Sequence, residues 1–150
     1  MADSALKSSL TADMKAAMKG GDKSSLAVIR MMLAAIKQVE VDERIELDDS
    51  RVIAVLDKMA KQRRESITQF EKGGRQDLIE TEQAELEIIQ RYLPAALGDD
   101  EIARLIDDAL QQCGATEIKQ MGQVMGILKP QLQGRADMGK VSQLIRSRLN

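Results

Sequence analysis

The chain has 150 residues, enough for one ordinary domain or two small ones with a hydrophobic core. Apolar residues make up 43% of it, but Phe70 and Tyr92 are its only aromatic residues, so the core must be aliphatic side chains and methionine, which favours helix. The net charge is −2, histidine is absent and Cys113 is the only cysteine. These counts exclude the usual zinc ligand sets, an intrachain disulfide and a Cys–His nucleophile pair. We therefore expect no metal site.

The beginning of the chain shows no signal-peptide pattern, and no run of 18 apolar residues occurs anywhere. We therefore expect a soluble cytoplasmic protein that does not contact membranes.

The first 49 residues predict two antiparallel helices followed by a loop. Apolar side chains recur every three or four residues over 3–19 and again from Lys23, and Gly20-Gly21 separates the two stretches. Asp22 is placed to cap the second helix at its N-terminus. The acidic residues 41–49 break the pattern and predict a connecting loop.

Two further helices are predicted over residues 50–72 and 76–92, with Gly73-Gly74 as the turn between them. Folding the helices back about this turn brings Arg63 within reach of Glu82 or Glu85. An ion pair that fixes the register of the hairpin and two side chains that extend to water are equally consistent with the sequence. Pro94 ends the fourth helix, so we predict a helical hairpin domain over residues 1–94.

Residues 95–150 predict a second, small domain of three helices. Asp99 is expected to cap the first, with Cys113 in its last turn and Gly114 at its end. The second begins near Thr116 and should kink or end at Pro130, and the third runs over 138–149. The predicted fold is therefore all-α: an N-terminal helical domain of two αα-hairpins, then a small three-helix C-terminal domain.

Charge is distributed unevenly over this second domain. Residues 98–117 contain six acidic residues and one basic residue, whereas residues 118–150 contain six basic residues and one acidic residue. Such an asymmetry can create a basic binding surface on a protein of nearly neutral charge.

The most distinctive stretch runs from Met121 to Lys140, because it combines four glycines with basic side chains. A turn framed by glycines leads into the last helix, whose free amides and dipole attract anions. The predicted structural residues of this motif are Gly122, Gly126, Gly134, Asp137 and Gly139. The candidate nucleic-acid-binding residues around it are Lys119, Lys129, Arg135 and Lys140.

An alternative structural role fits the same residues. Gly122 and Gly126 lie one turn apart and predict close packing of another helix, and Gly134 is a common type of helix terminator. No Gly-Lys-Ser/Thr pattern or preceding strand supports a nucleotide site. Scarce aromatic residues disfavour stacking on single-stranded bases, so phosphate contacts would suit a folded RNA that is read by its shape and backbone, such as tRNA. We expect no binding of DNA.

Several motifs resemble those of YqeY-like proteins. They are Lys61-Gln-Arg-Arg64, Gly74-Arg-Gln-Asp-Leu78, Tyr92-Leu-Pro94, Met121-Gly-Gln-Val-Met-Gly-Ile-Leu-Lys-Pro130 and Gly134-Arg-Ala-Asp137. The resemblance covers essentially the whole chain. The family is in turn similar to the tail of the B subunit of the glutamine-dependent Asp-tRNA/Glu-tRNA amidotransferase.

This resemblance implies a tRNA-binding accessory protein in aminoacyl-tRNA metabolism, with an aminoacyl-tRNA synthetase or an amidotransferase subunit as a further partner. It implies no catalytic residues and no cofactor. Two other functions stay open: a component of a glutamine-dependent tRNA amidotransferase, which is a carbon–nitrogen ligase, and a protein-interaction adaptor that does not bind RNA. No nucleophile–base pair or phosphate loop supports catalysis by this chain alone.

Overall fold

A computed structural model describes residues 4–149 of the chain. In this part the fold contains only helices and their connections, which confirms the predicted all-α class. The contacts divide the chain into two compact units, Met1–Leu93 and Pro94–Asn150. Across the described residues, every helix is too short or too polar to cross a membrane.

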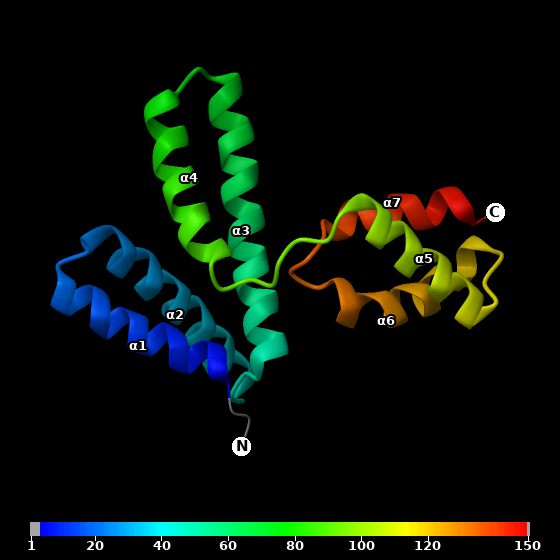
Figure 1. Cartoon of the computed structure of the whole chain (residues 1–150), viewed down its shortest axis with the longest axis horizontal. Coiled ribbons are helices and arrows are strands. Elements are labelled where there is room, and N and C mark those ends of the chain that lie inside the picture. The colour runs from blue at the N-terminus through cyan, green and yellow to red at the C-terminus, as the bar shows by residue number, and fades with distance from the viewer. Residues whose placement is uncertain (1–3, 150) are drawn as a thin grey trace. The chain divides into compact units, whose positions relative to one another are not determined.

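The unit Met1–Leu93 consists of two antiparallel helix pairs (Figure 1). Its helices are α1 (Ala5–Gly20), α2 (Lys23–Glu43), α3 (Asp49–Lys72) and α4 (Gln76–Gln90). Aliphatic side chains and methionine from all four helices form its core, and the fully buried ones include Leu10, Met32, Ile36, Leu56 and Ile89. These residues belong to the helical stripes in the sequence, which explains why the four helices could be predicted.

Two predicted features of α2 have different outcomes. Asp22 caps the helix as expected, because its carboxylate accepts a hydrogen bond from the backbone N–H of Ser25 at 3.2 Å. The predicted loop over 41–49 is too long, since the helix continues through Glu43 and ends only where Arg44 adopts a left-handed φ of 57°. The apolar pattern fades earlier because Val41 lies on the exposed side of the last turn.

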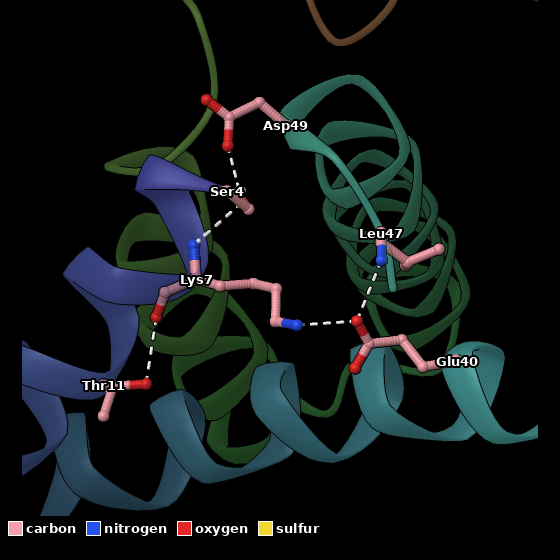
Figure 2. A network of polar contacts seen from close by, with 6 residues as sticks. All are labelled: Ser4, Lys7, Thr11, Glu40, Leu47 and Asp49. Atoms are coloured by element: carbon pink, nitrogen blue, oxygen red, sulfur yellow. Dashed lines mark hydrogen bonds and ion pairs between the residues drawn. The ribbon is translucent and has the colours of Figure 1, made fainter. Parts of the chain in front are cut away.

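A polar network joins the start of α1 to the end of α2 and the following turn (Figure 2). The Oε2 atom of Glu40 accepts hydrogen bonds from Lys7 Nζ at 2.6 Å and from the backbone N–H of Leu47 at 2.9 Å. Ser4 caps α1 through its hydroxyl, which also donates to Asp49 Oδ1 at 2.5 Å. The network therefore fixes the turn that places Leu47 in the core.

Replacing Glu40 with glutamine is expected to lower the free energy of unfolding at neutral pH by about 1 to 2 kcal/mol, since a charged acceptor for two donors is lost. The hydrogen bond from Lys7, and then that from Leu47, hold the pKa of Glu40 below its ordinary value of 4.5. A lowered pKa contributes stability above the unfolded-state pKa, and this contribution disappears as pH falls through the folded-state value. The wild type should therefore lose more stability than Glu40→Gln below about pH 4.5.

The change can be measured by urea denaturation followed by fluorescence of Tyr92, the only tyrosine, which belongs to this unit. Glu46→Gln is the matched control, because Glu46 is exposed in the same turn and makes no side-chain hydrogen bond within the described residues. Equal stability and equal acid dependence of the two variants would contradict the role of the network.

The second hairpin contains the ion pair that the sequence left open. Arg63 Nε donates to Glu85 Oε2 at 3.2 Å, and both side chains are largely buried. Arg63 Nη2 also contacts the sulfur atom of Met31 in α2 at 3.8 Å. Of the two predicted partners, Glu85 is therefore the one that pairs with Arg63.

The unit Pro94–Asn150 contains α5 (Asp99–Cys113), a short 3-10 helix η1 (Ile118–Gln120), α6 (Met121–Leu132) and α7 (Met138–Arg148). Its core is aliphatic and contains the fully buried Ile106, Val124, Leu128, Leu132 and Ile145. The N-cap of α5 is Gly98, so the prediction of Asp99 as the cap was wrong by one residue. Asp99 lies in the first turn instead, where its negative charge still interacts favourably with the helix dipole. Helix α6 continues two residues beyond Pro130.

Candidate nucleic-acid interface

The two glycines of α6 lie on its exposed face. Both Gly122 and Gly126 are exposed, and a Cβ atom added to either would have no heavy atom of the described chain within 4 Å beyond its own helix. The predicted packing of another helix against them was therefore wrong. The buried residues of α6 are Val124, Leu128 and Leu132. Two residues along a helix is a rotation of about 200°, so a core built on Val124 leaves both glycines facing away from it.

One lysine precedes this pair of glycines and another follows it. Lys119 precedes Gly122 by three residues and Lys129 follows Gly126 by three, a spacing that places each lysine on the same side as its glycine. Both lysines are exposed, and Lys119 Nζ pairs with Glu117 at 3.0 Å in a solvated salt bridge. We call these four residues, Lys119, Gly122, Gly126 and Lys129, the α6 glycine face.

The turn before α7 is already occupied by the protein's own carboxylate. Asp137 is the N-cap, and its Oδ1 atom accepts the backbone N–H of Gly139 at 2.9 Å, as expected for a cap. This negative charge lies where a phosphate was predicted to bind, so it opposes an anion there. Gly134 has a φ of 77° just after α6 ends, a conformation that suits glycine at a helix terminus.

Arg135 has a structural role that its sequence context does not indicate. Its Nε donates to the backbone carbonyl of Ala95 at 3.2 Å, and its own carbonyl accepts the N–H of Leu97 at 2.9 Å. These bonds fasten the segment before α5 to the turn after α6. No local pattern could indicate them, because the partners are 40 residues apart.

Some of the remaining basic side chains are exposed, and others form ion pairs within the unit. Lys140 is exposed in the first turn of α7. Arg148, at the end of α7, pairs with Asp107 of α5 and donates to the carbonyl of Ala103 at 3.4 Å. Part of the charge asymmetry in the sequence is thus neutralised inside the unit. Of the four predicted contacts, Lys119, Lys129 and Lys140 are exposed, and Arg146 is exposed as well.

The sequence comparison identifies the family of this chain. Residues 7–149 match the profile of the family described as "Yqey-like protein". The chain belongs to this family. The resemblance seen in the motifs is thereby confirmed over nearly the whole YqeY-like chain.

Curated relatives include proteins named "Altered inheritance of mitochondria protein 41, mitochondrial". The one from Eremothecium gossypii is 38% identical over 110 residues, which are 71% of this chain and 60% of the relative. The one from Pyrenophora tritici-repentis is 35% identical over 131 residues, 85% of this chain and 71% of the relative. Because these relatives are named as mitochondrial, the prediction of a cytoplasmic location was wrong; composition and the lack of a signal pattern could not distinguish the two compartments.

Proposed function

We propose that this YqeY-like protein is a tRNA-binding accessory protein whose C-terminal unit contacts the RNA backbone through the α6 glycine face and Lys140. One observation carries the proposal: two glycines are exposed in a helix between two exposed lysines, and a Cβ atom added to either glycine would meet no heavy atom of the described chain within 4 Å beyond its own helix. Glycine inside a helix lowers helix stability by about 1 kcal/mol relative to alanine. No packing contact within the described fold compensates for a pair of glycines there. A bare helix surface lets a large, rigid anion such as an RNA strand approach the lysines closely.

The proposal includes the arrangement of the domains. The helical hairpin domain 1–94 would be separate in function from the three-helix domain 95–150, which would act like the amidotransferase tail that it resembles. The boundary between them would lie at Pro94, where the contacts divide the chain. An aminoacyl-tRNA synthetase or an amidotransferase subunit would then be a partner that shares the bound tRNA.

The adaptor function without RNA has less support. It would require the acidic and basic segments of the C-terminal unit to be available to a partner protein. However, Arg148 and Asp107 already pair with each other inside the unit. A role within a glutamine-dependent amidotransferase remains compatible with tRNA binding, because that reaction acts on a tRNA-bound substrate.

The test measures tRNA binding across a salt series for the wild type and for Lys119→Gln/Lys129→Gln. Arg135 is left intact, because its loss would also release the segment at Ala95. If both lysines contact phosphates, the slope of log K against log salt should flatten by about two, and the affinity should fall roughly tenfold or more at low salt. Mitochondrial tRNA belongs among the RNAs tested, since the relatives are named as mitochondrial.

Lys15→Gln/Lys23→Gln is the matched control, since it removes the same charge from exposed lysines of the other unit. It should shift the affinity little and leave the slope unchanged. No binding by the wild type at low salt, or the same slope for all three proteins, would overturn the proposal. A partner protein captured equally well after nuclease treatment would instead favour the adaptor.

A further inference from the structure

An open cleft of about 430 Å³ lies within the unit Met1–Leu93, whereas the proposed RNA surface belongs to the other unit. It forms where α1, the beginning of α2 and the residues after α4 meet. Its polar lining includes the carboxylates of Asp13 and Asp22, the guanidinium of Arg91 and the phenol of Tyr92, and its apolar lining includes Ala17 and Ile29. The cleft thus combines groups of both charges with a small apolar floor, where Ala17 and Ile29 expose 9% and 3% of their surface.

The carboxylate of Asp13 is held in place from one side. Tyr92 Oη donates to Asp13 Oδ2 at 2.6 Å, a bond between residues 79 positions apart. Burial, and then the hydrogen bond to Asp13, raise the pKa of Tyr92 to about 12, so the phenol stays a donor at physiological pH. The other oxygen, Oδ1, accepts no hydrogen bond from the described residues and can therefore accept one from a ligand.

The second carboxylate, Asp22, accepts hydrogen bonds that favour its charged form. Hydrogen bonds from the side chain and the backbone N–H of Ser25 hold the pKa of Asp22 below its ordinary value. Arg91 is near enough to favour the charged form of Asp22, but its guanidinium makes no hydrogen bond within the described part of the chain. Two carboxylates and one guanidinium leave the cleft with a net negative charge and one cation that can bind an anionic group.

We propose that this cleft binds a free α-amino acid with an aliphatic side chain. The ammonium group would lie at Asp13 and Asp22, the carboxylate at Arg91, and the side chain against Ala17 and Ile29. A simple amine would satisfy the carboxylates but not Arg91, and a simple acid would be repelled by the net charge. The inference concerns a small molecule and the other unit, so it is independent of the proposed RNA binding.

The test is a titration of the full chain followed by amide NMR, with L-leucine, L-leucine methyl ester and N-acetyl-L-leucine. The ester lacks the carboxylate and the acetyl derivative lacks the ammonium group. L-Leucine should give saturable shifts at residues around Ser25 and Tyr92, and each derivative should bind at least about tenfold more weakly, since each loses a charge-assisted hydrogen bond. No saturable shift with L-leucine, or equal affinity for either derivative, would overturn the inference.

Two variants separate recognition from folding. Asp13→Asn keeps a hydrogen-bond acceptor for Tyr92 but removes the negative charge, so the affinity for L-leucine should fall about tenfold. Arg91→Gln should abolish the preference for L-leucine over its methyl ester while keeping the preference over the acetyl derivative, a change that mere loosening of the fold would not produce. The controls Glu46→Gln and Arg64→Gln alter exposed charges of the same unit and should leave all three affinities unchanged. An unaltered ester preference in Arg91→Gln would contradict the assigned role of Arg91.

Discussion

Replacing Gly122 and Gly126 with alanine is expected to stabilise the C-terminal unit and at the same time to weaken its binding of tRNA. An added Cβ at either position meets no heavy atom of the described chain beyond its own helix within 4 Å, so the gain in helix propensity is not offset by a clash. The gain should total about 1 to 2 kcal/mol, with less from Gly122 because it lies in the first turn of α6. The two methyl groups would hold an RNA backbone away from Lys119 and Lys129, and we expect a loss of affinity of roughly tenfold.

Opposite effects on stability and binding are the informative result, since a variant that merely unfolded would lose both. The unit Pro94–Asn150 contains no aromatic residue, so its stability is best followed by hydrogen exchange of the buried α6 amides. Gly20→Ala is the matched control: Gly20 is also exposed and lies at the end of α1, and a Cβ atom added there would meet no heavy atom of the described chain within 4 Å beyond its own helix. It should leave tRNA binding unchanged. Unchanged tRNA binding by the α6 variant would show that RNA does not contact this face.

The helices could be predicted because each has a regular aliphatic stripe. Leu10 in α1, Ile36 in α2 and Leu56 in α3 occupy such stripes and are fully buried. The ends of the helices were harder to predict, because they depend on backbone conformations that the apolar pattern does not encode. Helix α2 extends beyond its last core residue and ends where Arg44 adopts a left-handed φ.

The role of the α6 glycines was open to prediction but was misjudged. Their spacing of four resembles a packing motif, yet Val124 and Leu128 already define the buried side of α6. The helical rotation between Val124 and Gly126 puts the glycines on the opposite side. Comparing the glycines with the aliphatic stripe of the same helix would have identified them as exposed.

Contacts between distant residues could not be predicted from local patterns. The bond from Arg135 to Ala95 gives a predicted RNA contact a structural role as well. The bond from Tyr92 to Asp13 builds one wall of the cleft, although the sequence marks Tyr92 only as a residue near a helix end. Both depend on how helices pack, which the periodicity of each helix leaves undetermined.

Replacing Glu85 with alanine is expected to lower the stability of the unit Met1–Leu93 by about 2 to 3 kcal/mol, because it leaves a largely buried guanidinium without its carboxylate. The exposed fractions of the Arg63 and Glu85 side chains are only 15% and 24%, so solvent screens the pair weakly. After the substitution, the Met31 sulfur would be the only side-chain partner of Arg63 within the described residues, and sulfur is a weak acceptor. Glu82→Ala is the matched control, since Glu82 lies on the same helix at intermediate burial without an ion pair there.

The change in stability of a double variant at Arg63 and Glu85 shows what the ion pair contributes. Breaking a buried pair is costly, but replacing both charges with apolar side chains is often neutral or stabilising. We therefore expect Arg63→Met/Glu85→Leu to be more stable than Arg63→Met or Glu85→Leu alone, with a coupling of about 2 to 3 kcal/mol in the double-mutant cycle of these substitutions, followed by Tyr92 fluorescence. If the double variant is stable but its α3–α4 hairpin exchanges amide hydrogens faster, the pair fixes the register of the helices rather than the stability of the unit. Additive single losses would mean that Arg63 and Glu85 act independently, despite the 3.2 Å between their polar atoms.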